Sequence, residues 1–115
     1  MSIDYSSQLG KKITTRGNKK FCLHIESILY ILCEGDFSTL FLNNHTRVHE
    51  IKPLKAYEEE LCDMGFIRIS RNTLINGKYI TKIINNSGKR MVYLGDDIVL
   101  HISKRRLNEV KRVLY

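Results

Sequence analysis

The segment from Gly65 to Asn76 restricts the fold of this chain more than any other. Apolar Ile67 and Ile69 alternate with polar neighbours, which is the period-two pattern of a strand that buries one face. The alternation stops at residues 71–73, Arg-Asn-Thr, and then apolar character returns. The segment therefore predicts two strands joined by an exposed polar tripeptide.

That tripeptide suggests a recognition role. Arg and Asn are the side chains best suited to bidentate hydrogen bonds with guanine and adenine edges. Ser70, Arg71 and Asn72 are accordingly candidate DNA contacts. A polar turn that serves only to join two strands would have the same composition, so these residues alone leave both interpretations open.

Strand patterns cover most of the remaining chain. Alternating or short apolar runs predict strands at residues 11–16, 20–25, 28–33, 37–42, 47–51, 79–84, 90–94 and 98–102. Between these runs lie turn residues rich in Gly, Asn and Asp. The aromatic residues Tyr30, Phe37 and Phe41 belong to apolar runs, and we expect them in the core rather than on a stacking surface.

Two helices complete the prediction. The first begins at Pro53, where a missing N–H is harmless, and ends at a left-handed cap on Gly65. The second follows Ser103 as N-cap, with an apolar stripe at Leu107, Val110 and Leu114. The chain is thus predicted to be mainly β, with layered antiparallel sheets, a short central helix and a C-terminal helix. Residues 1–20 are expected to form a polar arm with an edge strand, and residues 21–115 the domain.

Charge is segregated along the chain, which carries a formal net charge of +7. Residues 21–63 hold eight acids and three bases, whereas residues 64–94 hold six bases and no acid. Segregation of this kind favours a molecule with one positive face for a polyanion.

The C-terminal helix begins with three cations, Lys104, Arg105 and Arg106. Cations at a helix N-terminus oppose the helix dipole, at about 0.3–1 kcal/mol each. A bound phosphate would reverse the sign of that effect. The cluster therefore predicts a DNA contact, although a solvated cluster without a ligand is the alternative.

Several classes of protein are disfavoured. The three cysteines are odd in number and widely spaced, which argues against a disulfide framework and against zinc binding. The sequence has no apolar run of 18 residues, and Glu58 to Glu60 are typical of the solvated face of a helix rather than of catalytic carboxylates. We expect a cytoplasmic protein that is not an enzyme and that needs no metal or cofactor.

With these residues in place, the chain resembles the LytTR DNA-binding domain, the output module of bacterial response regulators in two-component systems. The resemblance runs from Phe21 to Leu114. It is carried by F-I-R-I-S-R-N-T-L-I-N at residues 66–76, by I-L-Y-I-L-C-E-G-D-F-S-T-L-F-L at residues 28–42, by the Glu-rich helix at 53–62, by K-Y-I at 78–80 and by S-K-R-R at 103–106.

The resemblance implies sequence-specific binding to duplex DNA by a transcription regulator. Loops and the start of the C-terminal helix would enter successive major grooves, and two protomers would bind direct repeats. The family's base-contacting positions correspond here to Ser38, Arg71 and Arg105.

The chain departs from the family pattern in two ways. Ser70 stands where the family often has His, so the preferred DNA sequence is not predictable. The given sequence begins almost directly with the domain, without the phosphoacceptor receiver usual in the family, so we expect either a stand-alone regulator or an excised fragment, with a missing receiver domain or a separate regulatory partner. A single-stranded nucleic-acid binder and an interaction module for an acidic protein remain alternatives. Arg68 is expected to contact either a phosphate or a neighbouring carboxylate.

Overall fold

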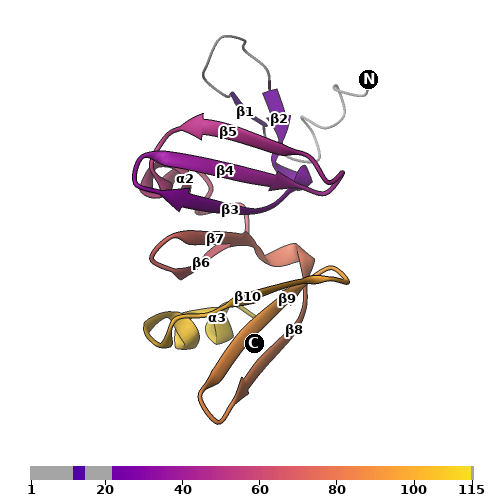
Figure 1. Cartoon of the computed structure of the whole chain (residues 1–115), viewed down its shortest axis with the longest axis vertical. Helices are drawn as coiled ribbons and strands as arrows, with labels where there is room; N and C mark the ends of the chain where they lie inside the picture. The colour runs from indigo at the N-terminus through magenta and orange to yellow at the C-terminus, as the bar shows by residue number, and fades with distance from the viewer. Residues whose placement is uncertain (1–11, 15–21, 115) are drawn as a thin grey trace.

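The computed structural model describes residues 12–14 and 22–114 (Figure 1). Its strands are β1 (Lys12–Thr14), β2 (Cys22–His24), β3 (Ile28–Glu34), β4 (Phe37–Leu42), β5 (Arg47–Ile51), β6 (Phe66–Ser70), β7 (Thr73–Asn76), β8 (Ile80–Asn86), β9 (Lys89–Leu94) and β10 (Ile98–His101). Its helices are α2 (Leu54–Glu60) and α3 (Leu107–Leu114), with 3-10 turns η1 (Ile25–Ser27), η2 (Gly77–Tyr79) and η3 (Lys104–Arg106).

The strands form antiparallel sheets, as the sequence predicts. The large sheet has the order β5-β4-β3-β7-β6, the small sheet has the order β10-β9-β8, and β1 pairs with β2. The predicted mainly β architecture with a central and a C-terminal helix is therefore confirmed. Within the described part of the chain, neither helix is long and apolar enough to span a membrane.

Two hydrophobic cores lie on opposite faces of the large sheet. One core joins β3, β4 and β7 to helix α2, and the other joins β6 and β7 to the small sheet and helix α3. Strand β7 contributes to both, because Leu74 packs into the first core and Ile75 into the second. All four residues of β7 are buried. The segment that the sequence singled out thus lies at the centre of the fold.

The central helix differs from its prediction at both ends. Pro53 is the N-cap rather than the first helical residue, and the helix ends at Glu60. Gly65 does adopt the predicted left-handed conformation, with φ of 85°, but it lies in the loop beyond the helix. Its carbonyl accepts a hydrogen bond from the N–H of Gly77 at 2.9 Å. Leu61, the C-cap, is fully buried, and its carbonyl accepts a hydrogen bond from the N–H of Met64 at 3.0 Å in the turn that follows the helix.

Two further predictions are corrected. Thr73 is 6% exposed and belongs to β7, so the polar turn consists of Arg71 and Asn72 alone. Phe37 is 64% exposed and is not a core residue. Residues of a strand alternate between its faces, and Leu40 on β4 points into the core with Ser38, so Phe37 must point away. Residues 1–11, 15–21 and 115, which include the predicted arm, lie outside the described residues.

Candidate nucleic-acid interface

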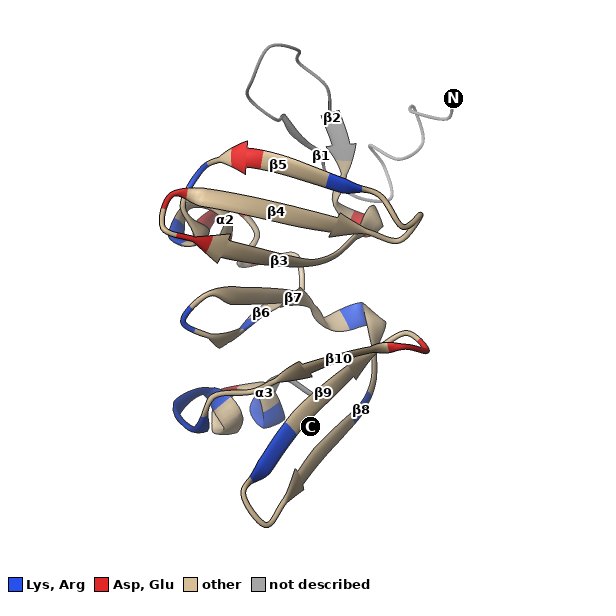
Figure 2. Cartoon of the chain, viewed as in Figure 1, with Lys and Arg blue, Asp and Glu red and all other residues tan. Residues whose placement is uncertain are grey.

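An arginine-lined hollow separates the β6–β7 turn from η3. Its volume is about 300 Å³, and its lining residues are Arg68, Arg71, Ser103, Arg105 and Arg106. Figure 2 shows Lys and Arg concentrated at both segments, on the same side of the molecule. The chain therefore brings together cations that are more than thirty residues apart in sequence. Such a concentration of guanidinium groups attracts an anion.

Backbone hydrogen bonds hold η3 beside strand β6. The N–H of Ser103 donates to the carbonyl of Ile69 at 2.8 Å. One residue earlier, the carbonyl of Ile102 accepts a hydrogen bond from Nε of Arg90 at 3.1 Å. The β6–β7 turn and η3 are thus both attached to strand β6.

The turn itself is ordered by its own polar side chains. Oδ1 of Asn72 accepts hydrogen bonds from Oγ of Ser70 at 2.9 Å and from Oγ1 of Thr73 at 3.1 Å. The main-chain carbonyl of Asn72 accepts from the N–H of Cys33 at 2.9 Å. Arg71 at the tip is exposed. Ser70 and Asn72 therefore shape the turn, and a bidentate contact of Asn72 with adenine would require these bonds to be exchanged.

The Arg68 side chain holds the β6–β7 turn in place. Its Nη1 lies 2.8 Å from Oε1 of Glu58 on helix α2, its Nε donates to the carbonyl of Ser70 at 3.1 Å, and its Nη2 donates to the carbonyl of Arg71. The side chain is only 17% exposed. Of the two expected partners for Arg68, the structure shows the carboxylate. Arg68 is therefore a positioning residue for the turn.

The cations of η3 differ in exposure. Lys104 and Arg105 are exposed, whereas Arg106 is half-buried with its Nη1 3.6 Å from Oε1 of Glu109. Ser103 occupies the predicted N-cap position, but its side chain makes no capping hydrogen bond. The first turn is a 3-10 turn, and helix α3 begins only at Leu107. The N-cap prediction is thus correct in position and wrong in mechanism.

Ser38 does not lie on this surface. Its side chain is buried, the residue being 1% exposed, and its hydroxyl donates to the carbonyl of Lys52 at 2.5 Å. A base edge cannot reach Ser38 in this conformation. We therefore leave Ser38 out of the proposed DNA contacts. The β3–β4 turn that precedes Ser38 nevertheless lies close to Arg71.

A second hollow connects that turn to the first hollow. Its volume is about 310 Å³, and it is lined by Cys33, Gly35, Pro53, Leu54, Lys55, Arg68, Arg71 and Asn72. Arg68 and Arg71 belong to both hollows. The β3–β4 turn, the β6–β7 turn and η3 thus form one continuous surface, which we call the loop face. Figure 1 shows these three segments on one side of the molecule.

Comparison with known families places this geometry in context. The family model described as the LytTr DNA-binding domain matches residues 18–115. The chain belongs to this family of DNA-binding domains. A search of curated proteins found no match.

A solved structure shows that the LytTR domain has a known fold. The fold of this chain is similar to that of the LytTr DNA-binding domain of a protein from Bacillus cereus described as a methyl-accepting/DNA response regulator, with a TM-score of 0.76. The two share 13% sequence identity over 90% of this chain and 95% of the other. At this identity the similarity establishes the architecture of the domain.

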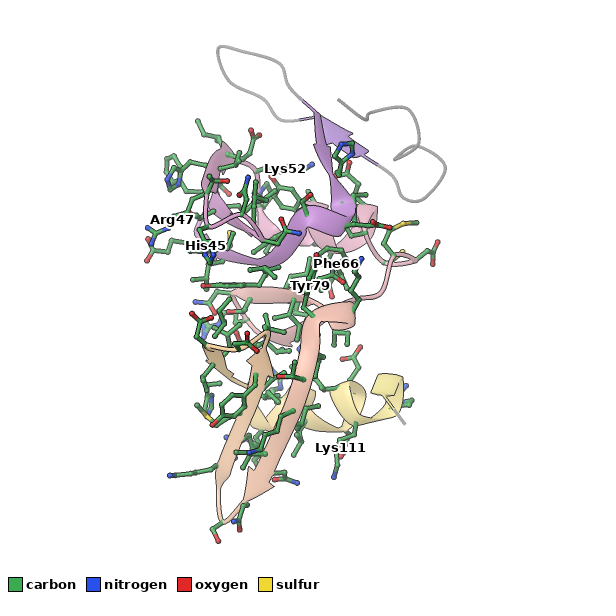
Figure 3. The ribbon with its side chains drawn as sticks, turned by 90° about the vertical axis from the view of Figure 1, so that its right-hand side faces the viewer. His45, Arg47, Lys52, Phe66, Tyr79 and Lys111 are labelled. Carbon is green, nitrogen blue, oxygen red and sulfur yellow. The ribbon has the colours of Figure 1, made fainter. Side chains whose placement is uncertain are left out.

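The side of the LytTR domain opposite the loop face has a different character. Figure 3 shows His45 and Arg47 there, at the β4–β5 turn, and Tyr79 on η2. Tyr30 stacks on Phe41 with ring centroids 4.4 Å apart, and burial raises the pKa of Tyr30 although Arg47 opposes the shift. The Tyr30 phenol is therefore neutral at physiological pH. These residues line a hollow of about 500 Å³ that also contains Asp96 and Asp97, so acids face it, unlike the arginine-lined hollow beside η3.

Two features of the LytTR domain escaped the sequence prediction. A carboxylate was one of the two partners expected for Arg68, but that it is Glu58 depends on how α2 packs and was not predicted. The exposed pair formed by Phe37 and Ile51 depends on the register of β4 and β5, which place these two residues directly opposite each other. The alternation of Leu40 and Leu42 would have revealed the outward direction of Phe37.

Proposed function

We propose that this LytTR domain binds duplex DNA sequence-specifically and serves a bacterial transcription regulator. The observation that supports this function is the arginine-lined hollow between the β6–β7 turn and η3. Arg71 and Arg105 enter it from two separate elements and are exposed. Arginine forks of this kind make bidentate contacts with guanine in the major groove.

The residues of the loop face have different roles in this proposal. Arg71 and Arg105 contact bases, and Lys104 contacts a phosphate as a mobile point charge. Arg106, which is restrained by its ion pair with Glu109, contacts a phosphate next to the one that Lys104 contacts. Ser70 and Asn72 order the turn through their mutual hydrogen bond. Phosphate contacts then fix the position of the domain, while the two arginines select the sequence.

The aromatic residues of the basic segment, residues 64–94, argue against binding to single-stranded nucleic acid. Single-strand binders stack bases on exposed aromatic rings. Here Phe66 is buried, the hydroxyl of Tyr79 donates to the carbonyl of Glu26, and half-buried Tyr93 has Nζ of Lys82 5.4 Å from its ring centroid. The segment therefore offers little ring surface to an unpaired base.

Family membership supports the wider setting of the proposal. Two protomers would occupy adjacent direct repeats in the bacterial cytoplasm, and a receiver domain or a separate regulatory partner would control them. Each protomer would contribute its own loop face. If the two protomers contact each other, a duplex with two repeats should be bound more tightly than a duplex with one, because the second binding event is then intramolecular.

The test begins with selection of bound sequences from random duplex DNA. Fluorescence anisotropy on the enriched duplex, a scrambled duplex and a single strand, each at several salt concentrations, measures specificity and charge neutralisation. We expect an enriched motif that is bound much more tightly than scrambled duplex. Salt-sensitive binding without an enriched motif would contradict sequence recognition, and preference for the single strand would contradict duplex binding.

A further inference from the structure

The most exposed apolar residues of the described chain lie side by side at the end of the large sheet. Phe37 is 64% exposed and Ile51 is 63% exposed. They are direct cross-strand partners on β4 and β5. Single apolar residues are common on protein surfaces, but a contiguous apolar patch usually marks a binding site. This pair therefore needs a partner.

The pair lies next to the β3–β4 turn of the loop face. Phe37 follows the β3–β4 turn directly, and Gly35 of that turn lines the same hollow as Arg71. Ile51 is followed by Lys52, whose carbonyl accepts the Ser38 hydroxyl, so the ends of β4 and β5 are tied together there. The patch thus lies at the same end of the large sheet as the β3–β4 turn, on the sheet face opposite α2, and its two residues line neither hollow of the loop face.

The charges around the patch restrict what it can contact. Glu34 pairs with Phe37 across the β3–β4 turn, and Asp36 precedes Phe37; both acids are exposed. Two carboxylates resist close approach to the phosphate backbone. The turn can therefore approach DNA favourably only where base edges, rather than phosphates, face it. In the major groove the apolar group on a base edge is the C5-methyl of thymine.

We propose that Phe37 and Ile51 bind the C5-methyl group of thymine in the major groove and so select thymine at one position of the site. This inference rests on the proposed duplex binding. It gives the β3–β4 turn an apolar recognition role in place of the polar contact expected from Ser38. Arg71 and Arg105 would select guanines elsewhere in the same site.

Replacing thymine by deoxyuridine tests the proposal directly, because the two bases differ only in the methyl group. Each thymine of the enriched motif is replaced in turn, and affinity is measured by anisotropy on a duplex with a single motif. We expect the wild-type protein to lose about fourfold in affinity at the contacted thymine, as for one buried methyl group. The other replacements should have little effect.

The protein variants complete a double-mutant cycle. Phe37→Ala should lose most of the preference for thymine over uracil, because only Ile51 then remains against the methyl group, whereas Phe37→Leu should keep more of it. Val99→Ala is the matched control, since Val99 is also exposed and apolar, at 42%, but lies on β10 of the small sheet. It should keep the wild-type preference. Because Phe37 is mostly exposed, its truncation should leave the fold intact, which circular dichroism checks.

Three results would overturn this inference while leaving the proposed function standing. The first is a wild-type protein whose affinity does not change at any uracil replacement. The second is a Phe37→Ala variant that keeps the full thymine preference, and the third is a Phe37→Ala variant that weakens binding only to a duplex with two motifs. The last result would assign the patch to contact between protomers. In each case an enriched motif that is sensitive to Arg71→Ala would still support sequence-specific binding, whereas absence of any motif would contradict the proposed function itself.

Discussion

Arg68 and Glu58 form an ion pair between strand β6 and helix α2, with Nη1 and Oε1 2.8 Å apart. The same guanidinium group donates to the carbonyls of Ser70 and Arg71. One arginine therefore couples the position of a helix to the shape of the β6–β7 turn. Its geometry depends on the planar fork, which a lysine cannot reproduce.

Removing this fork should affect both stability and recognition. We expect Arg68→Ala to lower the free energy of unfolding by about 1–2 kcal/mol, because its charged hydrogen bonds are partly shielded from water. It should also weaken specific DNA binding through disorder of the turn. Urea unfolding and anisotropy measure the two effects. Arg68→Lys should show both defects, and wild-type behaviour of this variant would mean that charge alone matters.

Arg71→Ala should weaken binding selectively. Loss of a bidentate base contact reduces affinity for the enriched duplex by about 1–3 kcal/mol and relaxes base preference at one position. Repeating the selection with the variant identifies that position. Arg71→Lys, which keeps the charge, should also lose the preference. Equal loss of affinity on specific and scrambled duplexes would assign Arg71 to a phosphate instead.

Lys104→Ala should weaken binding to all duplexes alike. Loss of one phosphate contact lowers the slope of log affinity against log salt concentration by about one. Lys82→Ala is a suitable control, because Lys82 is an exposed cation on β8 outside the loop face. The control should leave the salt slope unchanged. A change of base preference in Lys104→Ala would contradict its assignment to the backbone.

Ser38→Ala separates a structural role from a DNA contact. The buried hydroxyl of Ser38 bonds to the carbonyl of Lys52, so its removal should lower the free energy of unfolding by about 1–2 kcal/mol. The selected motif should stay the same as for the wild-type protein. If the motif changed at one position while stability did not, Ser38 would have to reach the DNA after a rearrangement of β4.

Much of the fold could be predicted from local pattern. The predicted bounds of β4 and β5 agree with the structure, because short apolar runs end at clear turn residues. The helix end at Gly65 could not be predicted from its glycine, since the chain uses Gly65 to approach Gly77 rather than to cap α2.

The cations of the candidate site could be predicted from the sequence, but the orientation of the residues at the start of β4 was predicted less well. Arg71 and Arg105 stand out in sequence, and the structure brings them to one hollow. The burial of Ser38 and the exposure of Phe37 follow from the face of β4 that meets helix α2, which the alternation of Leu40 and Leu42 indicates although the apolar run as a whole does not. When a base-contacting position is carried over from the family pattern to Ser38, the match does not say which way the side chain points.

The placement of the β6–β7 turn has a consequence for how such DNA-binding domains diverge. Its tip consists of two exposed residues, whereas the strand that follows is buried in both cores. A substitution at the tip can therefore change the preferred operator at little expense in folding, and a substitution in β7 disturbs the whole domain. Under the proposed function, gene duplication followed by changes at Arg71 would yield paralogues with new targets on an unaltered scaffold, whereas a change at Asn72 would also remove the hydrogen bonds that order the turn.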